Sequence, residues 1–168
     1  VNGTDLFPRL CAQFASSGHR VFLLGAKPGV ATQVAAWAAA SFPGMIIAGT
    51  QDGYFDEAET DRVLRTIRQS GADVLFVAMG APRQEKWIRQ YAAKTGATVT
   101  LGVGGLFDYY SGNIPRAPLW MRRLGLEWIF RLIQEPGRLW KRYLVGNWVF
   151  MARVTADRLQ QSLKSNRP

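Results

Sequence analysis

The chain has 168 residues, 48% of them hydrophobic, so it can bury a core and is not a disordered segment. Its one cysteine, Cys11, excludes an internal disulfide framework and fits a reducing compartment. The formal net charge is +9, but residues 1–115 hold 10 Lys or Arg and 9 Asp or Glu, whereas residues 116–168 hold 11 and 3.

The first 115 residues alternate helical and strand-like patterns, which predicts an α/β fold. In chain order we expect a helix at 4–17 with Pro8 in its first turn, a strand at 19–25, a helix at 28–41, a strand at 45–49, a helix at 56–69, a strand at 73–79, a helix at 82–94 and a strand at 97–103. Asp56 and Glu59 predict a capping box at the start of the third helix. This alternation indicates a parallel sheet with helices on both faces.

The pattern changes after Pro115, where 118–134 and 136–163 have helical, amphipathic composition. We therefore predict two domains, a sheet body at 1–115 and a helical appendage at 116–168. The appendage carries most of the net charge and four of the six tryptophans, which suits an anionic partner such as lipid headgroups, phosphates or nucleic acid. No run of about 18 apolar residues is present, so no spanning helix is expected.

Four glycine-containing loops are expected after the four strands, at 25–29, 49–54, 80–87 and 102–108. In open parallel sheets, ligands bind beyond the carboxyl ends of the strands. Glycine lets the backbone approach a ligand closely, and free N–H groups at the following helix start favour phosphate. The sequence therefore predicts a ligand site at this edge.

Two of these loops carry candidate polar side chains. Gln84 and Glu85 follow Pro82 and are expected on an exposed first helical turn, where an amide suits a base or a sugar hydroxyl. An alternative is equally consistent with the sequence: Gln84 is simply solvated, and Glu85 interacts with the helix dipole. Asp108 is expected at the end of a strand, as a hydroxyl ligand, a base or a turn cap. With one cysteine and one histidine, His19, no thiolate–imidazole zinc site can form.

Several motifs together resemble the WecG/TagA/CpsF family of glycosyltransferases, in order and over nearly the whole chain. They are VNGTDLF at 1–7, LLGAKPG at 23–29, GAPRQEKW at 80–87, GVGGLFDYYSG at 102–112, RAP at 116–118, LEW at 126–128 and EPGRLWKRYL at 135–144. The resemblance implies a Rossmann-like core that transfers a sugar from a UDP-sugar to a polyprenyl-diphosphate-linked sugar, without cofactor or metal. The resemblance leaves the transferred sugar open among N-acetylmannosamine, its uronic acid and a hexose. It also leaves the product open among teichoic acid, enterobacterial common antigen and exopolysaccharide.

The resemblance and the loops together give the predicted site residues. The donor-binding set is Gly80, Pro82, Gln84, Glu85, Gly104, Gly105 and Asp108. For the diphosphate, the resemblance implies Arg131 and Arg138 of the appendage, with Arg142 or Lys141 in addition. The resemblance also implies a catalytic base, an aspartate that the family carries in a segment before the motif that begins here at Val1. Neither Asp5 nor Asp108 matches it, so no catalytic residue is assigned. We expect this chain to bind UDP weakly and to transfer sugar poorly or not at all, because losing a base costs about 10²–10⁴-fold in rate.

The expected setting is the cytoplasmic face of the bacterial plasma membrane, with the appendage bound peripherally to the anionic surface. A homo-oligomer remains open. Two other functions also remain open, a nucleotide-binding module without catalysis and a nucleic-acid-binding protein. The sequence pI of about 10.3 is permissive for the second, but no known nucleic-acid motif occurs, so nucleic acid is not an expected partner.

Overall fold

The computed structural model of the chain describes residues 3–115, 117–134, 136–137, 151 and 154–155. The chain divides into two compact units, Val1–Pro115 and Arg116–Pro168. The first unit is built on a parallel sheet with the strand order β2-β1-β3-β4. Its strands are β1 (Arg20–Gly25), β2 (Ile46–Gln51), β3 (Val74–Ala78) and β4 (Val99–Gly102).

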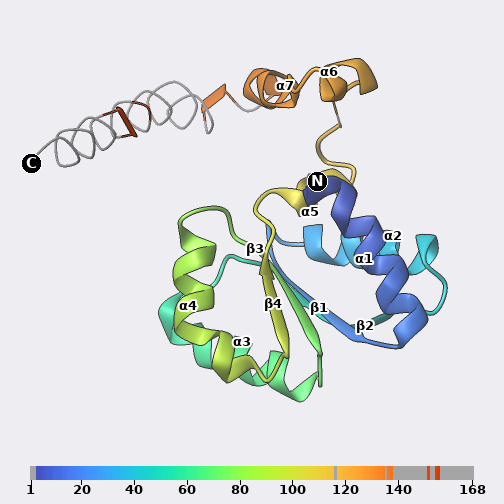
Figure 1. The fold of residues 1–168 in the computed structure, drawn as a ribbon. Coiled ribbons are helices and arrows are strands. Elements are labelled where there is room, and N and C mark those ends of the chain that lie inside the picture. Colours follow the sequence, from blue (N-terminus) through green and yellow to red (C-terminus); the bar gives the residue numbers. More distant parts are fainter. Residues whose placement is uncertain (1–2, 116, 135, 138–150, 152–153, 156–168) are drawn as a thin grey trace, which may run out of the picture. The chain divides into compact units, whose positions relative to one another are not determined.

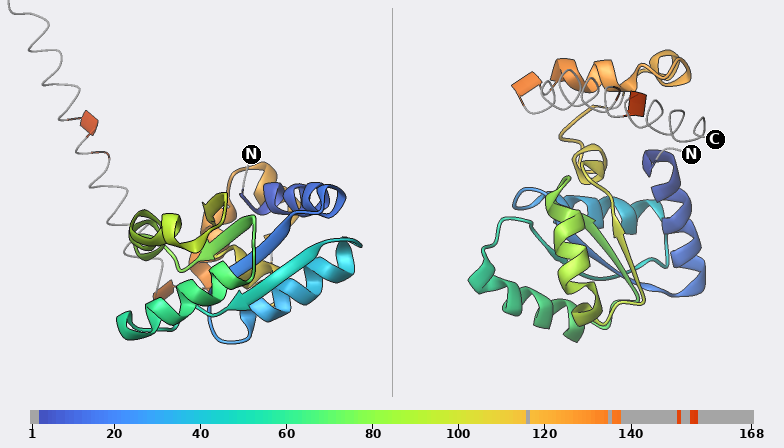
Figure 2. Two further views of the ribbon diagram at one scale, coloured as in Figure 1. Left: turned by 90° about the horizontal axis from the view of Figure 1, so that it is seen from below. Right: turned by 60° about the vertical axis from the view of Figure 1, so that its left-hand side comes forward.

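Helices cover both faces of this sheet. In Figures 1 and 2, α1 and α2 lie on one face, and α3 and α4 lie on the other. The bounds in this unit are α1 (Gly3–Ser17), α2 (Val30–Ser41), α3 (Glu57–Gln69), α4 (Arg83–Thr95) and α5 (Leu106–Tyr110). The predicted α/β class with a Rossmann-like parallel core is therefore confirmed. The continuous apolar run of β3 is the reason for this fold. β3 is buried along its whole length, because helices cover both faces of the sheet.

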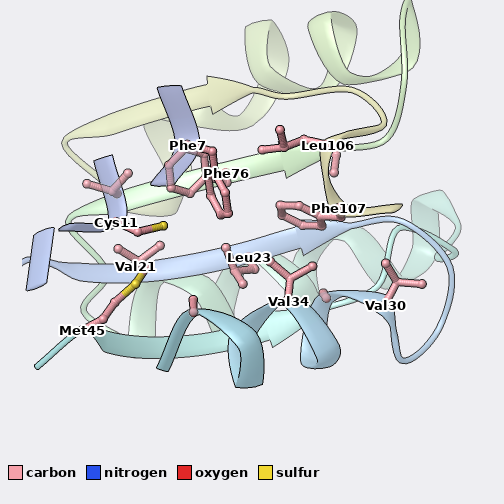
Figure 3. Packing of buried hydrophobic residues seen from close by; sticks show 14 residues of the cluster. Phe7, Cys11, Val21, Leu23, Val30, Val34, Met45, Phe76, Leu106 and Phe107 are labelled. Carbon is pink, nitrogen blue, oxygen red and sulfur yellow. The ribbon is translucent and has the colours of Figure 1, made fainter. Parts of the chain in front are cut away.

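One core lies between the sheet and α1, α2 and α5 (Figure 3). Phe7 of α1 meets Phe76 of β3 edge-on, with ring centroids 5.1 Å apart. Phe107 of α5 is fully buried in the same cluster. Because α5 is held by this packing, the segment that follows β4 has a fixed path along the edge of the sheet.

A second core lies on the opposite face, beneath α3 and α4. Along β1 the side chains alternate between the two cores, with Val21 and Leu23 in the first and Phe22 and Leu24 in the second. The residues that α3 and α4 contribute to the second core are Val63, Leu64, Ile67 and Trp87. The central strands are thus enclosed on both sides, which leaves the ends of the strands as the place for polar chemistry.

The capping box predicted for α3 is confirmed. The Asp56 carboxylate accepts from the backbone N–H of Glu59 at 2.9 Å, and the Asp56 N–H donates to the Glu59 carboxylate at 3.4 Å. Two orphan N–H groups at the start of the helix are satisfied in this way. The start of α3 is therefore fixed directly after the loop that follows β2.

The expectation that Pro8 sits in the first turn of its helix is wrong. Because α1 begins at Gly3, Pro8 lies in the helix interior and has no N–H to donate to the Thr4 carbonyl. The Tyr110 hydroxyl donates to this carbonyl oxygen instead. A contact from α5 thus satisfies the backbone group that the proline leaves without a helical donor.

Cys11 is fully buried in the first core, and desolvation raises the pKa of its thiol to about 12. Since the thiolate is the reactive form, we expect almost no labelling by a colorimetric thiol reagent at pH 8 in the native protein. Labelling should be complete after denaturation. Rapid labelling of the native chain would contradict the packing of α1 against the sheet.

The described part of the second unit holds two short helices, α6 (Leu119–Arg123) and α7 (Glu127–Gln134). The single helix expected over 118–134 is therefore interrupted. Gly125 adopts a left-handed conformation, with φ +71°, between the two helices. This ends the first helix as a glycine does at a helix C-terminus. No helix in the described portion of the chain is long and apolar enough to cross a membrane.

Candidate functional site

The loops after the four strands lie at one edge of the sheet, because all four strands run parallel. The chain leaves β1 toward β2 on one side and leaves β3 toward β4 on the other. The point where the direction reverses therefore falls between β1 and β3. In open α/β sheets, this switch point is where ligands bind.

At the switch point the backbones of the loops after β1 and β2 are in close contact with each other and with the end of β3. The Ala26 N–H donates to the Ala78 carbonyl at 2.7 Å, and the Gly53 N–H donates to the Ala26 carbonyl at 2.9 Å. Gly25 has φ +126°, and a Cβ there would lie 2.4 Å from the Ala78 oxygen. Only glycine fits this position, and main-chain bonds join the loops after β1 and β2 to each other and to the end of β3.

The loop after β2 is also tied to the start of α4. Asp52 accepts from the Tyr54 N–H at 2.8 Å, which closes a tight turn. The Arg83 guanidinium donates to the Phe55 carbonyl at 3.2 Å and lies 5.9 Å from the centroid of the Phe55 ring. The Tyr54 side chain itself is 66% exposed. The loop is thus rigidly placed and presents an aromatic ring to solvent.

The sequence predicted Gln84 on an exposed helical turn, but in the structure this residue is buried. Its side chain is only 7% exposed. Its Oε1 accepts from the Gly104 N–H at 2.8 Å, and its Nε2 donates to Glu85 Oε1 at 2.9 Å. The side chain packs against the end of β4, where a Cβ on Gly102 would lie 3.0 Å from Nε2. Because glycine has no side chain, Gly102 leaves space for the Gln84 amide, and this glycine is the feature of the sequence that could have indicated the contact.

Asp108 does not end a strand. β4 stops at Gly102, a turn follows, and α5 then carries Asp108, which is half-buried. The short helix forms because Leu106 and Phe107 are drawn into the first core. The sequence predicts a loop here, because five residues are too few to show a helical period.

The structure brings most of the predicted donor-binding residues to this edge. Gly80 accepts from the Gln84 N–H at 3.0 Å, Pro82 immediately precedes α4, and Glu85 is exposed on its first turn. Gly104 and Gly105 form the turn before α5. Of the predicted diphosphate residues, Arg131 lies in α7, while Arg138 and Arg142 fall outside the described residues.

Two polar contacts at this edge were not predicted from the sequence. The hydroxyls of Thr32, in the first turn of α2, and Thr50, near the end of β2, lie 3.3 Å apart. Arg83 was overlooked although it directly precedes Gln84 in the same motif. Within the described residues, no group of three or more His, Cys, Asp or Glu side chains could hold a metal ion.

An apolar pocket of about 200 Å³ lies beside the end of β4, against α1. Its lining is Gly3, Leu6, Phe7, Leu10, Phe76, Leu101, Gly102, Val103 and Leu106. None of these residues belongs to the predicted donor-binding set. A nucleotide needs polar partners that this lining lacks, so the glycine-rich edge rather than the pocket is the candidate site.

The fold and its switch-point edge define a Rossmann-like α/β unit. The model of the glycosyl transferase WecG/TagA/CpsF family matches residues 1–164, and the chain belongs to this family. The family predicted from the motifs is therefore confirmed. The chain is 42% identical over 144 residues to the N-acetylglucosaminyldiphosphoundecaprenol N-acetyl-beta-D-mannosaminyltransferase of Bacillus subtilis (strain 168). That alignment covers 86% of this chain and 55% of the relative, so the chain spans about half the length of the curated relative it matches.

Proposed function

We propose that this chain contributes the donor-binding core and the C-terminal unit of a glycosyltransferase that makes a cell-wall polymer. The sugar is N-acetylmannosamine, the donor is its UDP derivative, and the acceptor is N-acetylglucosamine linked to undecaprenyl diphosphate. The observation that carries this proposal is the 42% identity to a transferase whose name specifies that sugar and that acceptor. The switch-point edge supports it, because ligands of open α/β sheets bind at this place and free N–H groups at the starts of the following helices favour phosphate.

The proposed reaction is a displacement at the anomeric carbon. The acceptor hydroxyl oxygen forms a bond to this carbon while its proton passes to a base. The bond from the anomeric carbon to the phosphate oxygen breaks, and UDP leaves with the electron pair. Positive groups stabilise the departing diphosphate. As the family resemblance implies, Arg131, Arg138 and Arg142 fill this role in our proposal rather than a metal ion, because guanidinium groups offer paired donors to phosphate oxygens.

Calorimetry with UDP tests the donor site on the 168-residue chain. We expect saturable binding, and its absence would contradict the proposed donor-binding role. Donor choice is tested by UDP release with an N-acetylglucosaminyl-diphospholipid acceptor and the Bacillus relative as a positive control. We expect UDP-N-acetylmannosamine to be used, and a preference for the uronic acid or for UDP-glucose would contradict the proposed sugar.

We propose further that the second unit binds peripherally to an anionic membrane surface, on the cytoplasmic side where the lipid-linked acceptor is met. Residues 116–168 hold 11 Lys or Arg against 3 Asp or Glu. Large apolar side chains are exposed on its described helices and in the turn between them, at Leu119, Trp120, Leu124, Trp128 and Ile133. Basic charge combined with exposed tryptophan and leucine is the composition of an interfacial helix.

A further inference from the structure

The first turn of α4 reaches the loops of two other strands through consecutive residues. Arg83 donates to the Phe55 carbonyl, in the loop after β2, at 3.2 Å. Gln84 accepts from the Gly104 N–H, in the turn after β4, at 2.8 Å. β2 and β4 are at opposite ends of the strand order, so this turn of α4 links loops from the two outer strands.

The Gln84 amide is committed to protein partners at both ends. Besides the Gly104 bond through Oε1, its Nε2 donates to the Glu85 carboxylate at 2.9 Å. The side chain is more than nine-tenths buried, and its amide lies against the backbone of Gly102. A buried amide that is satisfied in this way is costly to turn outward, because both bonds would be lost.

The turn that Gln84 holds needs an anchor. Gly104 is left-handed, with φ +58°, and a Cβ there would meet nothing within 4 Å. On one side Val103 donates to the Val77 carbonyl at 2.8 Å, and on the other Leu106 donates to the Val103 carbonyl at 3.2 Å. Between them, the bond to Gln84 determines the direction of the Gly104 N–H.

We propose that Gln84 is a positioning residue, which holds the Gly104–Gly105 turn and the Glu85 carboxylate in place at the edge where the nucleotide is proposed to bind, without touching the nucleotide itself. The proposal rests on the proposed function for the identity of the ligand. Because the Gly104 N–H already donates to Gln84, the positioning acts on the path of the turn and not through this N–H.

The test compares three variants of the 168-residue chain by two measurements. Gln84→Ala removes both bonds. Gln84→Glu keeps an oxygen that accepts from Gly104 but loses the N–H that donates to Glu85. Gln90→Ala is the matched control, since Gln90 is an exposed glutamine on the same helix. Hydrogen exchange of the Gly104 amide is followed by NMR without ligand, and UDP affinity is measured in 0.3 M salt to screen general charge repulsion.

For Gln84→Ala we expect Gly104 exchange and the Kd for UDP each to rise roughly tenfold, the effect of one lost hydrogen bond. Gln84→Glu should exchange like the unchanged chain and bind UDP more tightly than Gln84→Ala. Gln90→Ala should change neither quantity.

Two results would overturn the positioning role. One is an unchanged Gly104 exchange rate in Gln84→Ala. The other is weaker UDP binding by Gln84→Glu than by Gln84→Ala, because a direct donor to the nucleotide cannot be replaced by a carboxylate. If the unchanged chain fails to bind UDP, the proposed function fails, and with it the role of Gln84 in binding. An unchanged Gly104 exchange rate in Gln84→Ala, with UDP still bound by the unchanged chain, instead removes only the positioning role of Gln84.

Discussion

Replacing Gly25 by alanine is expected to destabilise the first unit by about 3 kcal/mol or more. The added Cβ would lie 2.4–2.7 Å from backbone atoms of Ala78, which cannot rotate away as a side chain can. The φ of +126° adds strain of its own, since it is a region that only glycine occupies readily. A loss of this size lowers the melting temperature of a chain of this length by about 10 °C, measured by circular dichroism.

Gly18→Ala is the matched control for Gly25→Ala. Gly18 also has a positive φ, +70°, but a Cβ there would meet nothing within 4 Å. This substitution should therefore cost only the left-handed strain, about 1 kcal/mol. Equal losses for the two variants would show that the close contact between the ends of β1 and β3 is not what requires glycine.

The second large effect is expected on membrane binding. Replacing Trp120 and Trp128 together by serine should weaken binding to anionic phospholipid vesicles about 30-fold, measured by flotation. The two side chains are 58% and 42% exposed, and each is expected to contribute about 1 kcal/mol at the headgroup boundary. Raising the salt concentration from 0.1 M to 1 M should also release the protein, because the screening length falls from about 10 Å to about 3 Å.

Val99→Ser is the control for the vesicle experiment, because Val99 is an apolar side chain of the first unit with 44% exposure. It should bind vesicles as the unchanged chain does. If it binds as poorly as the double tryptophan variant, or if binding does not depend on salt, the second unit is not the membrane-binding element.

The sheet and its helices were predictable because each has a strong local signal. β3 is a continuous apolar run, and the helix after β2 begins with a capping box that the structure reproduces. The position of the loops at one edge follows from parallel strands alone. These features depend on residues close together in the sequence, or on a rule that holds for every parallel sheet.

The details that failed depend on contacts between distant residues. Gln84 was expected on an exposed turn, but its burial requires the glycine at position 102 and the N–H of Gly104, some twenty residues away. Pro8 was expected in a first turn because proline is best tolerated there. It is accommodated further along α1 because the Tyr110 hydroxyl donates to the Thr4 carbonyl. Helix and turn preferences carry no information on such partners.

The bond from Tyr110 to the Thr4 carbonyl also bears on the order in which the protein matures during synthesis. The two residues are separated by 106 positions, and the Phe7 and Tyr110 rings lie 5.1 Å apart in the same place. A ribosome therefore releases α1 long before Tyr110, whose hydroxyl satisfies the Thr4 carbonyl, has been made. Until α5 emerges, the apolar side of α1 lacks part of its cover, and α1 depends on residues synthesised much later to reach its native packing.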